Sequence, residues 1–284
     1  MKNLSMAAAA LLICILTTAT AAMAQEEKNN PDQSFLSIPA GNWIDASLTG
    51  VVPETFKYQE KSPDCPANSM TFTFHYPKGL QAKGNGRVDN EVSGSVQSEL
   101  VEAINEFKEG GACGKDICGG ASCGEWISEK TFAVHTPSSG YLSILFTEFS
   151  DTGGAHPNTE YRVMNFRPDG ENLTLEDVFS DPAKSVPLYW DYVYAKWCAE
   201  HPDKFPLHYA TMQDCGTDSP DNPNTYEGAK TLDDLGRLVF TSFGATLVLG
   251  PYESGSYASG TVMLDLPKED LIKMGADPAV WGSK

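Results

Sequence analysis

Long apolar runs are missing from this sequence beyond its first residues. No stretch after position 24 reaches the roughly 18 apolar residues that a membrane helix needs, so the sequence predicts no membrane span in the mature chain. Basic residues are also scarce, with 20 Lys and Arg against 38 Asp and Glu. Such a charge repels nucleic acid and anionic lipid headgroups, and it attracts cations and basic proteins. We therefore expect no nucleic-acid partner, although solubility alone also explains the acidic surplus.

Signatures of common catalytic and cofactor sites are missing as well. There is no Walker loop, no H-E-x-x-H motif, no EF-hand loop and no dinucleotide-binding fingerprint. Four histidines are scattered without metal-ligand spacing: His75, His135, His201 and His208. The sequence therefore predicts no metal and no cofactor, and it favours a binding protein over an enzyme.

The first 24 residues have the pattern of a cleavable secretory signal. Lys2 supplies the positive charge, residues 7–15 form a short apolar core, and residues 22–24 form a small-x-small cleavage site. The predicted mature chain has 260 residues and a formal charge of −19, and its residues 25–45 are expected to be a flexible leader. We expect a periplasmic protein, with an extracellular location as the alternative.

Six cysteines remain after the predicted cleavage, an even number that indicates three disulfide bonds in an exported protein. Cys198 and Cys215 enclose a stretch with Pro and Asp, and we expect them to pair. Cys65 is then expected to pair with one member of a cluster whose other two members join; the cluster is Cys113, Cys118 and Cys123. A zinc site is the alternative, but the C-x4-C-x4-C spacing matches no common zinc pattern.

Periodicity predicts strands and helices in mixed order. Alternating apolar residues indicate half-buried strands, and apolar residues at every third or fourth position indicate helices. The expected strands are residues 70–76, 126–135, 141–149, 160–166, 238–243, 246–249 and 260–266. The expected helices are residues 88–107, a short helix capped by Thr174 and Asp177, residues 186–200, and a last one after Pro267.

This order of elements predicts the fold class. Because β-α-β alternation is not regular, we expect an α+β fold with antiparallel sheets and with helices packed on one face. Two sub-domains are expected, residues 46–150 and residues 151–284, and disulfide bonds are expected to stabilise them.

Residues 152–159 form a glycine-punctuated segment between two expected strands. Gly153 and Gly154 permit positive φ and Pro157 restricts the residue before it, so the loop presents His156 in an unusual conformation. Two roles for His156 stay open: a base or ligand at a functional site, or a brace that hydrogen-bonds backbone groups. The sequence favours the brace, because no nucleophile or second ligand stands at useful spacing.

Residues 251–260 form a second loop, rich in glycine and serine. It carries Tyr252, Glu253 and Tyr257, and tyrosines on an adaptable loop are typical of recognition surfaces. A β-turn whose tyrosines fold back onto the core is the alternative. The candidate ligand-binding residues are therefore Tyr252, Glu253, Tyr257 and His156.

Several stretches carry a family resemblance, above all Gly-Gly-Ala-His at 153–156 and Leu-Thr-Leu-Glu-Asp-Val-Phe at 173–179. With residues 141–144, 161–165 and 251–260 they resemble the extracytoplasmic domain family of unknown function shared by the lysozyme-sensing anti-sigma factor RsiV and the peptidoglycan deacetylase PdaC. The resemblance covers about residues 58–274. This chain differs in its cysteines and in Ser256, where a proline is common.

The resemblance implies a binding module of the cell envelope. We expect it to capture a lysozyme or another cationic protein, with Tyr252, Glu253 and Tyr257 as contacts. A peptidoglycan-binding module, whose exposed aromatic rings stack on sugars, is one alternative. The other is a hydrolase that uses His156 with Asp151 or Glu160 as an acid–base pair.

Overall fold

The computed structural model describes residues 41–62, 68–80, 86–108, 124–138, 140–153, 156–200, 237–251, 257 and 260–282. These residues belong to one compact unit, Phe35–Lys284. The predicted signal, most of the predicted leader and the loop expected after residue 200 lie outside the described residues. Within the described part, no helix combines the length and apolarity needed to cross a membrane.

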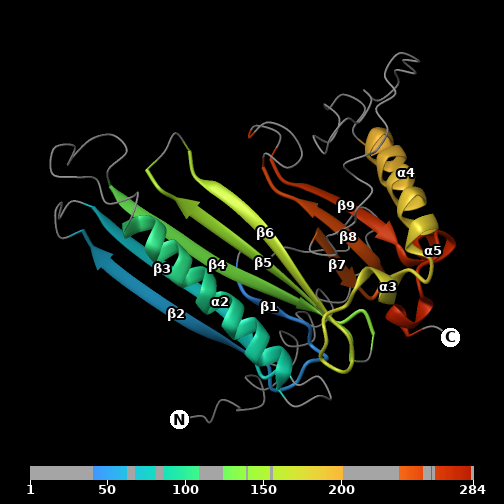
Figure 1. Cartoon of the computed structure of the whole chain (residues 1–284), viewed down its shortest axis with the longest axis horizontal. Coiled ribbons are helices and arrows are strands. Elements are labelled where there is room, and N and C mark those ends of the chain that lie inside the picture. The colour runs from blue at the N-terminus through green and yellow to red at the C-terminus, as the bar shows by residue number, and fades with distance from the viewer. Residues whose placement is uncertain are drawn as a thin grey trace, which may run out of the picture. The chain divides into compact units, whose positions relative to one another are not determined.

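A six-stranded sheet forms the larger layer of the protein. Its strands are β1 (Trp43–Ile44), β2 (Val52–Lys61), β3 (Ser69–Lys78), β4 (Glu125–His135), β5 (Leu142–Asp151) and β6 (Asn158–Phe166). The order across the sheet is β2-β3-β4-β5-β6, and β1 pairs with β4 beyond the end of β3 (Figure 1). The strands expected over residues 126–135 and 141–149 correspond to β4 and β5, which form an antiparallel hairpin. The boundary predicted between residues 150 and 151 falls inside β5, before its last residue, and β5 pairs with β6 in this sheet.

The prediction of purely antiparallel sheets is wrong, because β4 runs parallel to both β3 and β1. Helix α2 (Arg87–Glu106) returns the chain from the end of β3 to the end where β3 began. The next strand, β4, therefore runs in the same direction as β3. The helix packs Val88, Val92 and Val96 onto one face of the sheet, where the alternating apolar residues of β3 lie. One β-α-β unit and the short parallel pair of β1 with β4 therefore belong to a sheet whose other neighbouring strands are antiparallel.

A three-stranded antiparallel sheet forms the second layer, with β7 (Leu238–Thr241), β8 (Gly244–Leu249) and β9 (Val262–Pro267) in that order. Its outer face is covered by α3 (Leu175–Val178), α4 (Pro182–Glu200), α5 (Lys268–Lys273) and the 3-10 helix η6 (Pro278–Trp281). Gly244, the first residue of β8, lies very close to the main chain of β9. A Cβ at this position would lie 2.1 Å from the carbonyl oxygen of Leu266, so only glycine fits.

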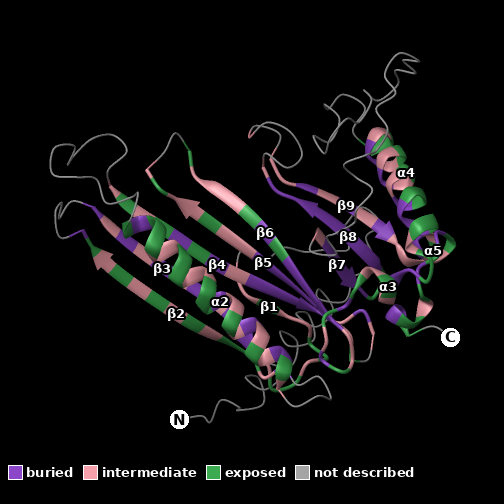
Figure 2. Ribbon diagram, in the orientation of Figure 1, coloured by how far each residue is buried: buried purple, intermediate pink, exposed green. Residues whose placement is uncertain are grey.

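The two sheets pack face to face. On β4, β5 and β6 the residues that point away from α2, such as Ala133, Leu145 and Val163, contact Val239 and Val248 of the smaller sheet. Both sheets have buried residues along the strands that meet here, drawn in purple in Figure 2. The layers therefore run from α2 through the two sheets to α4 and α5, so helices lie on both outer faces of the stack and on one face of each sheet.

Two polar side chains are buried between the sheets. Ser143 Oγ accepts a hydrogen bond from Phe240 N at 3.0 Å, and Asn165 Nδ2 donates to Leu238 O at 3.0 Å. Ser143 Oγ in turn donates to Asn165 Oδ1 at 2.6 Å. Side chains of the larger sheet thus satisfy the main chain of β7, which fixes how the sheets are aligned.

Candidate functional site

Two loops that lie about 100 positions apart in the sequence meet in the structure. Residues 152–157 connect β5 to β6, and residues 250–261 connect β8 to β9. The rings of His156 and Tyr257 are stacked, with centroids 3.8 Å apart and planes at 17°. The two segments that the sequence singled out therefore lie side by side, each contributed by a different sheet.

Local hydrogen bonds shape the first loop. Gly153 has a φ of 75°, and its N–H donates to Asp151 Oδ1 at 2.9 Å. His156 is exposed, and its Nδ1 lies 3.2 Å from the carbonyl oxygen of Pro157, to which it donates. This contact agrees with the predicted brace, while the stack also makes the His156 ring part of the exposed surface. Gly154 lies outside the described residues.

The second loop is joined to the first sheet just below the stacked rings. Tyr161 of β6 and Thr261, which precedes β9, share a hydrogen bond of 3.0 Å between their hydroxyl groups. Tyr257 is half-buried, so it neither folds entirely into the core nor stands free in solvent. Tyr252 and Glu253, the other predicted contacts of this loop, lie outside the described residues.

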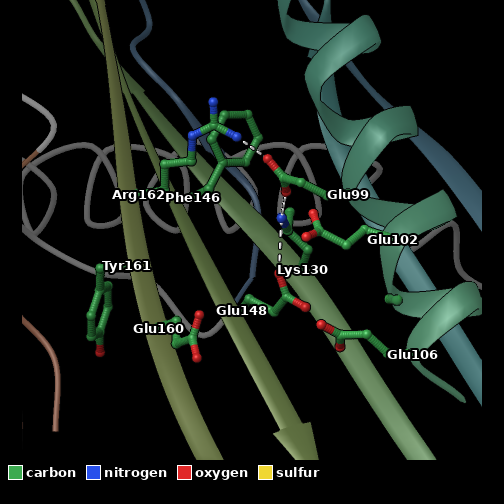
Figure 3. A pocket seen from close by; sticks show the side chains of 10 residues that line it. Glu99, Glu102, Glu106, Lys130, Phe146, Glu148, Glu160, Tyr161 and Arg162 are labelled. Carbon is green, nitrogen blue, oxygen red and sulfur yellow. Dashed lines mark hydrogen bonds and ion pairs between the residues drawn. The ribbon is translucent and has the colours of Figure 1, made fainter. Parts of the chain in front are cut away.

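A negatively charged groove lies at the foot of the first loop, between α2 and strands β4, β5 and β6. It has a volume of about 400 Å³ (Figure 3). Its wall holds five carboxylates and two cations: Glu99, Glu102, Glu106, Glu148, Glu160, Lys130 and Arg162. Phe146 and Tyr161 add aromatic surface. Glu148 and Glu160 are cross-strand partners, three residues before the end of β5 and two residues after the start of β6, the strands that the loop joins.

An ion-pair network occupies the deep side of the groove. Lys130 is 3% exposed; its Nζ pairs with Glu99, and it lies 2.8 Å from Glu148 Oε2. Burial lowers the pKa of Lys130, although the charge of Glu148 opposes that shift. Arg162 also pairs with Glu99. Both cations form ion pairs with Glu99 or Glu148. The other three glutamates are exposed, so the solvent-facing side of the groove is negatively charged.

The sequence prediction missed this groove. Its signal was present, because Glu99, Glu102 and Glu106 recur at helical spacing and therefore share one face of α2. A lysine at position 130, inside the strand expected over residues 126–135, was a second signal. No group of three or more His, Cys, Asp or Glu side chains is arranged to hold a metal ion in the parts that the structure describes.

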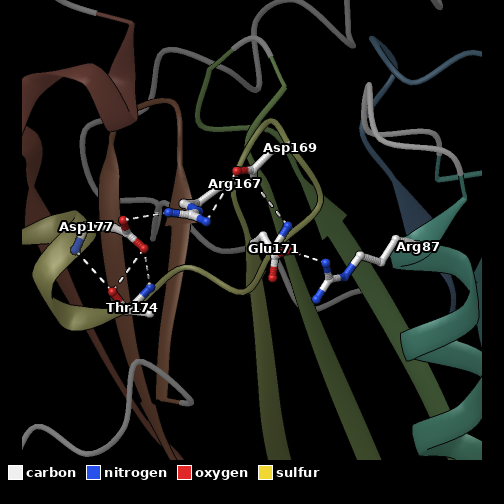
Figure 4. Close-up of polar contacts among 6 residues, drawn as sticks. All are labelled: Arg87, Arg167, Asp169, Glu171, Thr174 and Asp177. Atoms are coloured by element: carbon white, nitrogen blue, oxygen red, sulfur yellow. Dashed lines mark hydrogen bonds and ion pairs between the residues drawn. The ribbon is translucent and has the colours of Figure 1, made fainter.

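A separate polar cluster stabilises the turn after β6 (Figure 4). Thr174 and Asp177 form the predicted capping box at the start of α3, so that prediction is confirmed. Arg167 pairs with Asp177 at 3.0 Å, and Arg87 at the start of α2 pairs with Glu171. These contacts join α2, the turn and α3, and we assign them a structural role.

Asp151 and Glu160 are the two carboxylates considered as partners of His156 in a hydrolase. Asp151 Oδ1 accepts a hydrogen bond from Gly153 N, and Glu160 Oε1 accepts one from Asn158 Nδ2, both at 2.9 Å. Both carboxylates therefore have local partners. Among the six predicted disulfide cysteines, Cys198 of α4 lies within the described residues and the other five lie outside them. The Cys198–Cys215 pairing therefore stays a prediction, as do the other two bonds.

Comparisons with known proteins give structural neighbours only. No protein-family model matches the sequence, and no curated protein matches it. A DUF3298 family protein from Pseudomonas aeruginosa PAO1 is similar in structure, with a TM-score of 0.49 and 16% identity over 82% of this chain and 98% of that one. A member of the same family from Bacteroides fragilis NCTC 9343 has a TM-score of 0.47 and 16% identity, over 81% and 96% of the two chains.

The structural neighbours are DUF3298 proteins. They are of the RsiV and PdaC type, the type that the sequence resembles. At these TM-scores and identities, neither structure assigns a role to any residue of this chain.

Proposed function

We propose that this protein is an extracytoplasmic binding module of the cell envelope that captures a basic, lysozyme-like protein. The stack of His156 on Tyr257 carries the proposal, because it joins two loops from different sheets into one surface. Aromatic side chains on Gly/Ser-rich loops offer large contact areas with little entropy to lose on binding. The loop of Tyr257 also carries Tyr252 and Glu253, which we propose as further contacts.

The charge of the chain supports a cationic partner. The formal net charge is −18, and the groove beside the first loop presents Glu102, Glu106 and Glu160 to solvent. A field of this sign raises the rate at which a basic protein meets the loops, and the rate falls as salt is added. The loops would then supply the short-range contacts, and the groove would steer the approach.

The test is a titration of the purified protein with a basic lysozyme at about 20 mM and about 500 mM salt, read by calorimetry and by lysozyme inhibition. We expect binding at low salt that weakens at least tenfold at high salt. Tyr257→Ala should weaken it further, whereas Phe243→Ala should not, because Phe243 is an exposed aromatic residue in the turn between β7 and β8. Absence of both complex and inhibition at low salt would refute the lysozyme-like partner.

Peptidoglycan is the second candidate ligand, since the paired rings of His156 and Tyr257 also suit stacking on a sugar face. A pull-down with insoluble cell wall separates the two candidates. Retention that survives high salt and is lost in Tyr257→Ala would favour the glycan, because ring stacking depends little on ionic strength. The hydrolase alternative predicts instead that His156→Ala abolishes a turnover of wall fragments that the unaltered protein shows.

A further inference from the structure

A second contact between a histidine and an aromatic ring lies in the region where β1 meets β4; the two rings are tilted by 33°, and here the histidine ring is buried. His135 is the last residue of β4 and is 6% exposed. Its ring lies against Trp43 of β1, with centroids 4.6 Å apart. Its Nε2 is buried and makes no hydrogen bond within the described structure. A buried ring nitrogen without a partner has no group to accept its proton when the imidazole is charged.

Residues 41–48 cover this histidine and bind the end of β4 through one short strand and a few side chains, among them Asn42 Oδ1, which accepts from Phe132 N at 3.3 Å, and Ser47 Oγ, which lies 3.1 Å from Thr136 Oγ1. β1 is only two residues long and pairs with β4 at Ala133 and Val134. Asp45 N donates to Val134 O at 3.0 Å, and the Asp45 carboxylate accepts from Thr136 Oγ1 at 2.7 Å. Ile44 and Leu48 pack on the edge of the core beneath α2. None of residues 41–48 is buried, so this segment can open without the rest of the sheet.

Two opposing influences act on the charge of His135. Burial disfavours the imidazolium ion, and the negative charge of Asp45 favours it. Burial is the larger influence, and it lowers the pKa of His135 to about 4. Asp45 is the charged group that acts on this ring among the residues that the structure describes. In the closed arrangement the ring is therefore neutral at neutral pH.

We propose that residues 41–48 form an acid-released strap, in which proton uptake by His135 undocks β1 from β4 and uncovers that edge of the sheet. Opening exposes the ring to water, where an imidazole binds its proton near pH 6.5. Acid therefore favours the open form. The uncovered edge offers the main-chain groups around Val134, with which another strand can pair.

The size of the response follows from linkage. One proton is taken up on opening, so the opening constant rises by about tenfold for each pH unit between about 6.5 and 4. The rise over that whole range is about 300-fold. Above about pH 7 both forms are neutral at this ring, and the opening constant no longer depends on its titration.

Amide hydrogen exchange of the purified protein tests the strap, because Asp45 N is protected by its bond to Val134 O. After correction for intrinsic rates, its opening constant is expected to rise at least tenfold from pH 6.5 to pH 5, while amides in the middle of β5 do not follow. His135→Phe keeps a ring against Trp43 but cannot titrate, so it should remove the rise. His75→Phe, on a neighbouring strand, should keep it.

A flat response at Asp45 N in the unaltered protein would overturn the proposal, and so would an equal response in His135→Phe. If that variant does not fold, Trp43→Ala supplies the test through an NMR titration of the imidazole. Removing the covering ring should move the His135 pKa up toward 6.5. An unchanged titration in Trp43→Ala would also overturn the strap.

Discussion

Two histidines of this protein stack on an aromatic ring, and their surroundings differ. His135 lies buried against Trp43 at 4.6 Å, whereas the exposed His156 lies 3.8 Å from Tyr257. The first pair belongs to the packing of β1 on β4, so a change there alters folding. The second belongs to a surface made by two loops, so under the proposed function a change there alters binding. We propose that burial, and not the kind of pair, separates the effect on stability from the effect on binding.

The largest expected effect extends this comparison to Lys130, the most deeply buried cation of the groove. Lys130→Met leaves Glu99 and Glu148 without their shared cation, and breaking a buried ion pair costs about 3 kcal/mol or more. We expect the free energy of unfolding in urea at pH 7 to fall by about that amount. Lys184→Met is the matched control, because its pair with Asp181 is exposed and contributes less than about 0.5 kcal/mol. Equal losses in both variants would contradict the weight given to burial.

Acid sharpens the difference between the two stacks. The folded-state pKa of His135, about 4, lies below the unfolded value of 6.5, so the unfolded chain takes up the proton first. The contribution of this ring is therefore complete above pH 6.5 and is lost as the pH falls toward 4. The loss reaches about 3 kcal/mol over that range. Between pH 7 and pH 4.5, the free energy of unfolding should decrease less in His135→Phe than in the unaltered protein. An equal decrease in both proteins would contradict the assignment.

A reciprocal pair of variants breaks the two stacks one at a time. Tyr257→Ala should weaken binding of a basic lysozyme by about 2 kcal/mol, roughly 30-fold, and change the free energy of unfolding by less than about 0.5 kcal/mol. Trp43→Ala should do the reverse, lowering stability by about 1.5 kcal/mol through loss of the contact with His135 and leaving affinity unchanged. Calorimetric titration and urea unfolding of both variants measure this. A loss of affinity in Trp43→Ala would mean that the two regions are coupled.

The smallest expected effect lies at the capping box, away from both stacks. Thr174→Ala removes the side chain that accepts from Asp177 N, and loss of an N-cap costs about 1 kcal/mol. Thr174→Ser keeps the hydroxyl and should retain most of that stability. Thermal unfolding compares the two, and an equal decrease in Tm would show that the methyl group of Thr174 matters more than its hydrogen bond.

Local chemistry in the sequence predicted much of the fold. The alternation over 70–76 and the apolar stripe over 88–107 correspond to β3 and α2, because each pattern places its apolar side chains on one buried face. Strand β2 was missed because it is an edge strand, and only Phe56 and Tyr58 contact the core from its middle. Its polar and charged residues protect an edge and hide the alternation.

Strand direction and the groove could not be predicted in the same way. Whether β4 lies parallel or antiparallel to β3 depends on where the connection places the chain, and local periodicity carries no such information. The groove depends on the approach of three carboxylates on α2 to two cross-strand glutamates. The helical spacing predicted the first set as a face, but only the register of β5 with β6 brings Glu148 and Glu160 opposite that face.

The buried bonds of Ser143 and Asn165 to β7 have a consequence for the proposed docking surface. His156 extends from one sheet and Tyr257 from the other, so the spacing of their rings depends on how the sheets are aligned. A slide of one sheet past the other would leave donors and acceptors of Phe240 and Leu238 unsatisfied in a dry interior. Two small polar side chains in the core thus fix the alignment of the sheets, and through it the contact of His156 with Tyr257 at the surface.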